Sequence, residues 1–236
     1  MGMPMSIHLR GEDLARPEAE KAVAAAFSLL ARMDEIFSTW SPGSQVSRLR
    51  RGELALTDCD PLVDEAARIG SQAQQITGGA FTTLLPDAEG MPRFDPTGLV
   101  KGWAVDLAGD ELRGLPGVSW CINAGGDVRA GRHRHVPPTG DDAMPWRIGI
   151  ENPYDRSQID RVVPLIDGAV ATSGTAARGA HLYDPRTGQA VGRPGSTSVI
   201  GPDLLWADIW ATALFVGGAA TRAAFAEHTA YQVVDL

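Results

Sequence analysis

The stretch that most constrains the fold is ADIWATALF, residues 207–215, because it is apolar along nearly its whole length and is typical of a buried helix. Only Asp208 and Thr212 interrupt it, and four positions apart they lie about one turn from each other on one helical face. Two interpretations fit this pair. Asp208 caps the helix while Thr212 bonds back to the carbonyl of residue 208, or the two side chains offer oxygen ligands to a hard cation such as Mg²⁺.

Composition excludes several classes of protein. The 236 residues are 44% hydrophobic and 21% charged, as in an ordinary globular protein with a sizeable core. The net charge of −8 argues against a nucleic-acid-binding surface. No apolar run approaches the roughly eighteen residues of a membrane span. Cys59 and Cys121 are too few for a disulfide framework, and both are expected to be buried.

The segment AVAAAFSLLA at 22–31 is interpreted as part of an amphipathic helix. It is not a signal peptide, because the residues before it, RPEAEK, mix acidic and basic side chains where a signal peptide has a basic leader. We therefore expect a cytoplasmic protein without stable membrane insertion. An exported protein whose leader had been removed would have the same sequence.

The order of the predicted elements indicates one α+β domain over residues 1–236, with a mixed or antiparallel sheet. A helix is expected from Pro17 to Phe37, with Val23, Phe27 and Leu30 at helical spacing. Asp60 as cap and Pro61 at the first position predict a second helix. Further helices are expected over 99–112, around 208 and over 221–228, strands at 5–9, within 117–131, 146–153 and 162–174, and at 196–202 and 231–236, and a turn-rich segment over 38–52.

Three glycine-rich polar stretches carry the remaining chemistry. In FDPTGLVKG, residues 94–102, Lys101 near a helix start is a natural phosphate partner. The alternative is that Asp95 caps the turn, Gly98 has a positive φ and Lys101 is solvated. INAGGDV at 122–128 is either a tight turn or a place where backbone approaches a ligand. ATSGTAARGAHLYDPRTG at 171–188 contains His181, which is structural or catalytic.

None of these stretches matches a P-loop, a Rossmann fingerprint or a serine-hydrolase elbow. Together they suit a phosphorylated ligand with a metal, since Mg²⁺ is commonly held by one or two carboxylates plus a substrate phosphate. Trp40 lies in the turn-rich segment, and it either anchors that loop or stacks on a flat ring.

Taken in order, the segments resemble the ApbE family of flavin transferases over nearly the whole chain. The similar motifs are MGMPMSIHL, FSTWSPGSQVSRLR, GGAFTTLL, DPTGLVKGWAVD, INAGGD, ATSG…R…HLYDPRTG and ADIWATAL. The chain departs from the usual pattern at three places: Met3 stands where threonine is usual, Arg50 where asparagine is common, and Thr82 where aspartate is usual.

The resemblance implies an ApbE-like, T-fold-like fold that binds FAD with Mg²⁺. By that resemblance, the metal ligands are Asp208, Thr212 and the carbonyl of Gly98. Asp95 and Lys101 contact FAD, Trp40 faces the isoalloxazine, and the flavin pocket is lined by Met1, Ala80, Phe81 and Thr82. His181 matches the family's histidine near the flavin phosphates, and the base that takes the proton is His181, Asp95 or a metal-bound hydroxide.

The activity implied is Mg²⁺-dependent transfer of the FMN moiety of FAD onto a threonine or serine hydroxyl of an acceptor protein, with release of AMP. Two alternatives remain open: hydrolysis of FAD to FMN and AMP, and a non-catalytic FAD-binding or carrier protein. The chain contains no convincing copy of the family's target motif, which disfavours self-flavinylation.

Overall fold

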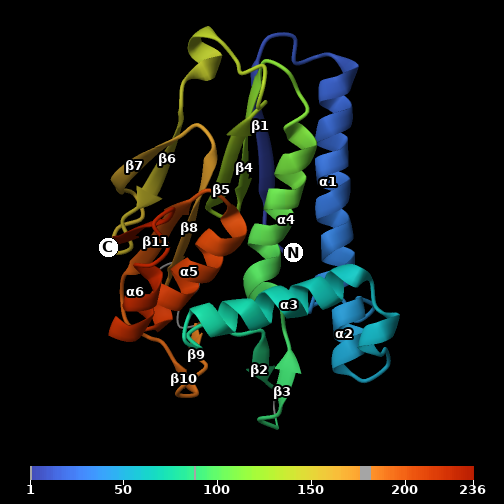
Figure 1. The fold of residues 1–236 in the computed structure, drawn as a ribbon, viewed down its shortest axis with the longest axis vertical. Helices are drawn as coiled ribbons and strands as arrows, with labels where there is room; N and C mark the ends of the chain where they lie inside the picture. The colour runs from blue at the N-terminus through green and yellow to red at the C-terminus, as the bar shows by residue number, and fades with distance from the viewer. Residues whose placement is uncertain (1, 88, 176–181) are drawn as a thin grey trace.

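A six-stranded antiparallel sheet forms the centre of this computed structural model, which describes residues 2–87, 89–175 and 182–236 (Figure 1). Every strand pairing is antiparallel, so the α+β prediction is confirmed and the sheet is not mixed. The strands, in their order across the sheet, are β1 (Met5–Gly11), β4 (Val118–Ala124), β5 (Asp127–Arg132), β8 (Gly168–Gly174), β11 (Ser196–Gly201) and β12 (Gln232–Asp235).

Helices cover one face of this sheet, with α4 and α5 packed on it and α1 packed against α4 (Figure 1). The helices are α1 (Pro17–Phe37), α2 (Gln45–Arg50), α3 (Pro61–Ile76), α4 (Thr97–Leu112), α5 (Leu204–Val216) and α6 (Ala219–Phe225), with 3₁₀ turns η1 (Leu56–Asp58) and η2 (Gly140–Ala143). Side chains alternate between the faces of a strand. In β8, Ala169 and Ala171 belong to the core under the helices, whereas Val170 belongs to a smaller core on the opposite face.

That smaller core lies beneath a hairpin. Ile150 and Val163 of the hairpin pack with Val170 of the sheet, so both faces of the sheet are partly covered. The hairpin consists of β6 (Trp146–Glu151) and β7 (Ile159–Leu165), and two further strand pairs are β2 (Leu84–Pro86) with β3 (Pro92–Phe94) and β9 (Tyr183–Asp184) with β10 (Gln189–Ala190).

Local capping chemistry explains the helix boundaries that the sequence predicted well. Helix α3 begins at Pro61, and the Asp60 side chain accepts a hydrogen bond from the Leu62 amide, as expected. One expectation was wrong, because the turn-rich segment contains α2, which is capped by Ser44. Phe27 lies in α1 at the expected apolar spacing, yet it is 44% exposed.

Helix α5 is buried on all sides, as its composition predicts, and its cap is not Asp208. The Asp203 carboxylate is the N-cap and accepts from the Trp206 amide at 2.9 Å. The capping interpretation of Asp208 is therefore wrong, and Asp208 lies within the second turn with only 5% of its surface exposed. No helix within the described ranges is both long and apolar enough to cross a membrane.

Candidate functional site

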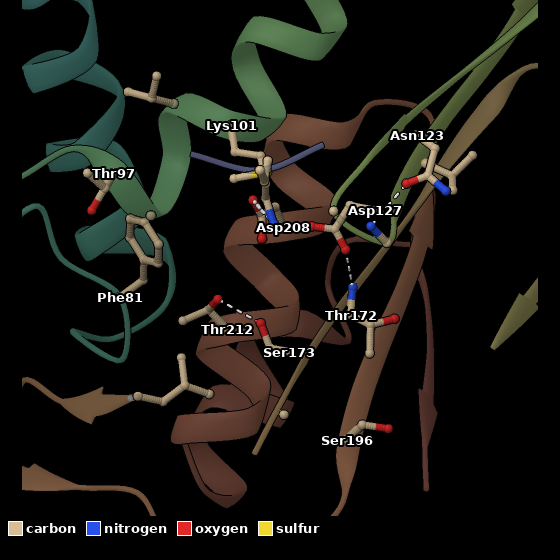
Figure 2. Close-up of a pocket in the computed structure, with 18 of the residues that line it drawn as sticks. Phe81, Thr97, Lys101, Asn123, Asp127, Thr172, Ser173, Ser196, Asp208 and Thr212 are labelled. Atoms are coloured by element: carbon tan, nitrogen blue, oxygen red, sulfur yellow. Dashed lines mark hydrogen bonds and ion pairs between the residues drawn. The ribbon is translucent and has the colours of Figure 1, made fainter. Parts of the chain in front are cut away.

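A large cleft opens where the start of α4, the β4–β5 turn and α5 meet. Its volume is about 1050 Å³, at the upper end of the range for small-molecule sites and sufficient for a dinucleotide. Figure 2 shows Lys101 of α4, Asp127 of β5 and Asp208 of α5 converging on one wall of this cleft. All the candidate residues in the described ranges line it: Trp40, Ala80, Phe81, Thr82, Asp95, Gly98, Lys101, Asp208 and Thr212.

The start of α4 is fixed by Asp95. Its carboxylate accepts hydrogen bonds from the backbone amide and the hydroxyl of Thr97, and it forms an ion pair with Arg50 at 2.8 Å. Asp95 thus caps the turn that precedes α4, as one interpretation predicted, while the N-cap position of the helix itself is Pro96 and has no side-chain cap hydrogen bond. The Asp95 side chain also lines the cleft, and its contact with FAD stays a prediction.

Gly98 lies inside the first turn of α4 and does not have a positive φ, so that expectation was wrong. The absence of a side chain has a different reason. A Cβ atom on Gly98 would lie 3.2 and 3.3 Å from two ring carbons of Phe81, closer than ordinary van der Waals contact. Glycine therefore lets the Phe81 ring approach the helix start, where backbone N–H groups favour anions.

Lys101 is not solvated, contrary to one interpretation of the sequence. Its ammonium group donates a short hydrogen bond to Asp127 and lies 3.3 Å from the Asp208 carboxylate. Burial alone lowers the pKa of Lys101, but the charges of Asp208 and Asp127 raise that pKa more, so the net shift is upward. The side chain is charged and is shared between two buried carboxylates.

Thr212 lies one turn beyond Asp208, on the same wall of the cleft. Its hydroxyl oxygen is 2.9 Å from the hydroxyl of Ser173 in β8, which holds it in place (Figure 2). The described part of the chain contains no group of three or more histidine, cysteine or acidic side chains placed to hold a metal ion. The atoms on this wall that could ligate a metal are carboxylate and hydroxyl oxygens, which suit Mg²⁺ and not zinc.

The expected flavin-binding residues form a second part of the cleft. Trp40 is 91% exposed and lines the opening, so it does not anchor its loop by burial. Ala80 and Phe81 are buried in the wall, and the Thr82 hydroxyl accepts from the Leu84 amide. Met1 and His181 lie outside the described residues, and their assigned roles stay predictions.

Two residues important to the site were not singled out from the sequence. Asp127 follows the paired glycines of INAGGDV, is 3% exposed, and fixes both Lys101 and the Thr172 amide. The signal available was an acid directly after a glycine turn at the end of a buried strand. Arg50, noted only as a departure from the family pattern, holds Asp95.

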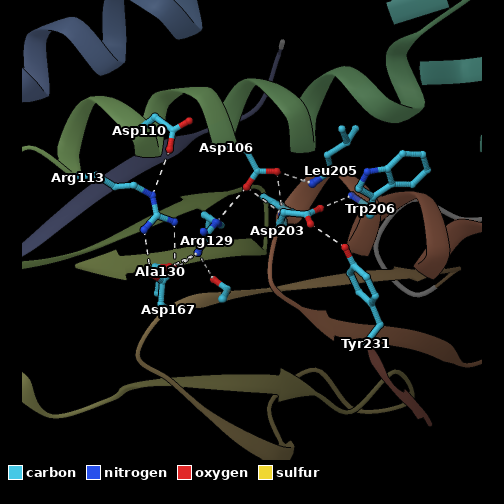
Figure 3. A network of polar contacts seen from close by, with 12 residues as sticks. Asp106, Asp110, Arg113, Arg129, Ala130, Asp167, Asp203, Leu205, Trp206 and Tyr231 are labelled. Carbon is cyan, nitrogen blue, oxygen red and sulfur yellow. Dashed lines mark hydrogen bonds and ion pairs between the residues drawn. The ribbon is translucent and has the colours of Figure 1, made fainter. Parts of the chain in front are cut away.

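The position of α5 depends on a polar network behind the cleft (Figure 3). The Asp106 carboxylate of α4 accepts from the amides of Leu204 and Leu205 and pairs with Arg129 at 3.0 Å. Burial raises the pKa of Asp106 to about 6, although these hydrogen bonds oppose the shift. Asp106 therefore ties α4 to the first turn of the helix that carries Asp208.

Fold and site together define an antiparallel α+β protein with a dinucleotide-sized cleft and an oxygen-donor wall. The sequence matches the model of the ApbE family over residues 84–234, and the chain belongs to that family. The matched range contains Asp95, Gly98, Lys101, Asp208 and Thr212 but not Trp40.

Named relatives agree with this membership. A FAD:protein FMN transferase of Vibrio cholerae is 33% identical over 187 residues, covering 75% of this chain and 53% of the relative. Another of Klebsiella pneumoniae is 26% identical, covering 92% of this chain and 77% of the relative. The chain thus spans about half the length of the Vibrio relative.

Solved structures show the same fold. The ApbE protein of Thermotoga maritima superimposes with a TM-score of 0.78 at 21% identity, covering 99% of this chain and 91% of that one. The flavin transferase ApbE from Vibrio cholerae gives a TM-score of 0.72 at 21% identity, covering 100% and 90%.

Proposed function

We propose that this chain transfers the FMN moiety of FAD onto a threonine or serine hydroxyl of an acceptor protein and releases AMP. The observation that carries the proposal is the wall formed by Asp208, Thr212 and the start of α4 inside a dinucleotide-sized cleft. Relatives named FAD:protein FMN transferase support the choice of substrate. A carrier protein would have little use for buried cation-binding oxygens at this position.

The site fits a divalent cation. Asp208, Thr212 and the backbone carbonyl of Gly98 would hold Mg²⁺, which would supply positive charge to the diphosphate of FAD. The helix start at Thr97 and Gly98 adds N–H groups that favour phosphate oxygens. Trp40, exposed at the opening, offers its face to the isoalloxazine ring.

The proposed reaction is an in-line displacement at phosphorus. The acceptor hydroxyl oxygen forms a bond to the phosphorus on the FMN side, and the bond from that phosphorus to the bridging oxygen breaks. AMP leaves with the bridging oxygen, and the hydroxyl proton passes to a base on the protein. Asp95 and His181 are the candidate bases, and positioning of the acceptor hydroxyl near the phosphorus is the main contribution of the cleft.

The proposal is tested by incubating the protein with FAD and Mg²⁺, with and without an acceptor domain bearing a target threonine. AMP is quantified by chromatography, and a denaturing gel is examined for flavin fluorescence. AMP release that requires the acceptor and leaves it covalently fluorescent supports the transferase. AMP and free FMN formed without acceptor would instead identify a FAD pyrophosphatase, and tight FAD binding without either product would identify a carrier.

A further inference from the structure

Three buried charged side chains meet on the wall of the cleft, and together they carry an excess negative charge. Lys101 comes from α4, Asp127 from the start of β5 and Asp208 from α5, and their side chains are 21%, 4% and 7% exposed. One ammonium group is thus shared by two carboxylates (Figure 2). Buried charges are costly unless they are paired, so Lys101 offsets part of the charge of both carboxylates.

The two contacts of Lys101 are unequal. Its ammonium group donates a hydrogen bond to Asp127, whereas the nearest Asp208 oxygen lies 3.3 Å away. Asp127 is also held independently of Lys101, because its other carboxylate oxygen accepts from the Thr172 amide at 2.8 Å. Asp127 is therefore a fixed anchor, while the contact with Asp208 is the one that is more easily released.

A divalent cation on Asp208 would lie close to the Lys101 ammonium, and like charges at such short range repel strongly in a buried site. Lys101 must then withdraw from Asp208 for the cation to bind. Because Asp127 already holds the ammonium, withdrawal does not leave a buried lysine unpaired.

We propose that Lys101 is a built-in counter-cation that competes with the divalent cation for Asp208, and that Asp127 is the positioning residue that retains Lys101 when the cation binds. This inference rests on the proposed function, since it takes Asp208 as a cation ligand. It assigns Asp127 a part in setting cation affinity without making it a ligand.

The test measures the affinity of the FAD-free protein for Mn²⁺, used as a paramagnetic probe in place of Mg²⁺, by electron paramagnetic resonance of the unbound ion. The variants are Asp127→Asn, Lys101→Met and the double variant. Asp127→Asn leaves Lys101 with Asp208 alone and is expected to weaken Mn²⁺ binding at least tenfold. Lys101→Met removes the competitor and is expected to tighten binding at least tenfold.

The double variant is the decisive comparison. Once Lys101 is absent, Asp127 has no ammonium to retain, so the double variant is expected to bind Mn²⁺ within about threefold of Lys101→Met. If Asp127→Asn weakened Mn²⁺ binding equally in the wild type and in Lys101→Met, the inference would be overturned. Asp127 would then act as a ligand of the cation or only through its charge. The matched charge control is Asp160→Asn, which removes an exposed carboxylate on β7 and should change the affinity for Mn²⁺ less than twofold.

The outcomes separate this inference from the proposed function. Lys101→Met and the double variant test the competition even if Asp127→Asn fails to fold, which circular dichroism would reveal. No tightening on Lys101→Met, with wild-type Mn²⁺ binding intact, would overturn the competition alone. Absence of Mn²⁺ binding in the wild type, or binding unaffected by Asp208→Ala, would overturn the cation site and the competition with it.

Discussion

At Gly102, helix α4 lies directly against the backbone of the first turn of α5, and Gly102→Ala tests whether that contact positions the site. A Cβ atom at this position would lie 2.7 Å from the Leu204 carbonyl oxygen and 3.0 Å from the Leu205 Cα. Both are backbone atoms of the first turn of α5, so no side chain can rotate away. Normal non-bonded separations are about 3.5 Å, so the helices must separate by roughly 0.5 Å or more.

The expected energy follows from two opposing effects. Alanine in a helix interior is favoured over glycine by about 1 kcal/mol. Overpacking of a well-packed contact costs about 1–3 kcal/mol, and a clash with backbone belongs at the upper end. The same displacement strains the hydrogen bonds from the Leu204 and Leu205 amides to Asp106. We expect a net loss of about 1–2 kcal/mol in the free energy of unfolding.

The assay is urea unfolding together with AMP release from FAD. Since Asp208 lies one turn beyond Leu204, its displacement is expected to lower the rate of AMP release about tenfold or more. Gly114→Ala is the matched control, because a Cβ there meets no atom within 4 Å and the residue is exposed. A Gly102→Ala protein that is more stable than wild type and fully active would refute the reasoning.

Three further predictions address individual groups. Asp208→Ala is expected to abolish Mg²⁺-dependent AMP release, and retained activity would exclude it as a cation ligand. Trp40→Ala is expected to leave the urea midpoint unchanged, because the side chain is 91% exposed, while a fluorescence titration shows FAD binding weakened about tenfold. The folded protein holds the proton of Asp106 more tightly than the unfolded chain does, because its pKa is raised from 3.8 to about 6. Protonation of Asp106 therefore stabilises the folded protein, by up to about 3 kcal/mol in the free energy of unfolding. This stabilisation is complete below about pH 4 and is lost as the pH rises through about 6. Urea unfolding at pH 4.5 and 7.5 should show a smaller loss of stability with rising pH in Asp106→Asn, and equal pH dependence in both proteins would contradict the assignment.

Much of the fold could be predicted from helix caps and hydrophobic spacing, because these depend on residues that are close together in the sequence. The Asp60–Pro61 pair fixes the start of α3, and the apolar run around Asp208 predicts a helix buried on every side. Helix α2 was missed because its six residues have no long apolar period, and its stability comes from the Ser44 cap and from packing of Val46. The exposure of Phe27 depends on which elements cover α1, which spacing alone does not determine.

The candidate site was predictable as a set of residues but not as a set of contacts. The motifs identified Lys101 and Asp208, which lie more than a hundred positions apart, yet only the fold shows that they form an ion pair. Asp127 received no role because its partners, Lys101 and the Thr172 amide, lie on α4 and β8. The pairing of Arg50 with Asp95 was likewise not predictable, since it depends on where α2 packs against β3, the strand that directly precedes Asp95.

The central claim is that the polar pair within α5 is a cation site serving the FAD diphosphate. The most direct test is a crystal structure of the protein with FAD and Mn²⁺, in which anomalous scattering locates the metal. The account predicts one peak in direct contact with the Asp208 carboxylate and the Thr212 hydroxyl, at about the 2.1 Å typical of Mg²⁺ sites, with the diphosphate beside it. Bound FAD with the metal elsewhere, or with Lys101 still paired to Asp208 and no metal present, would contradict it.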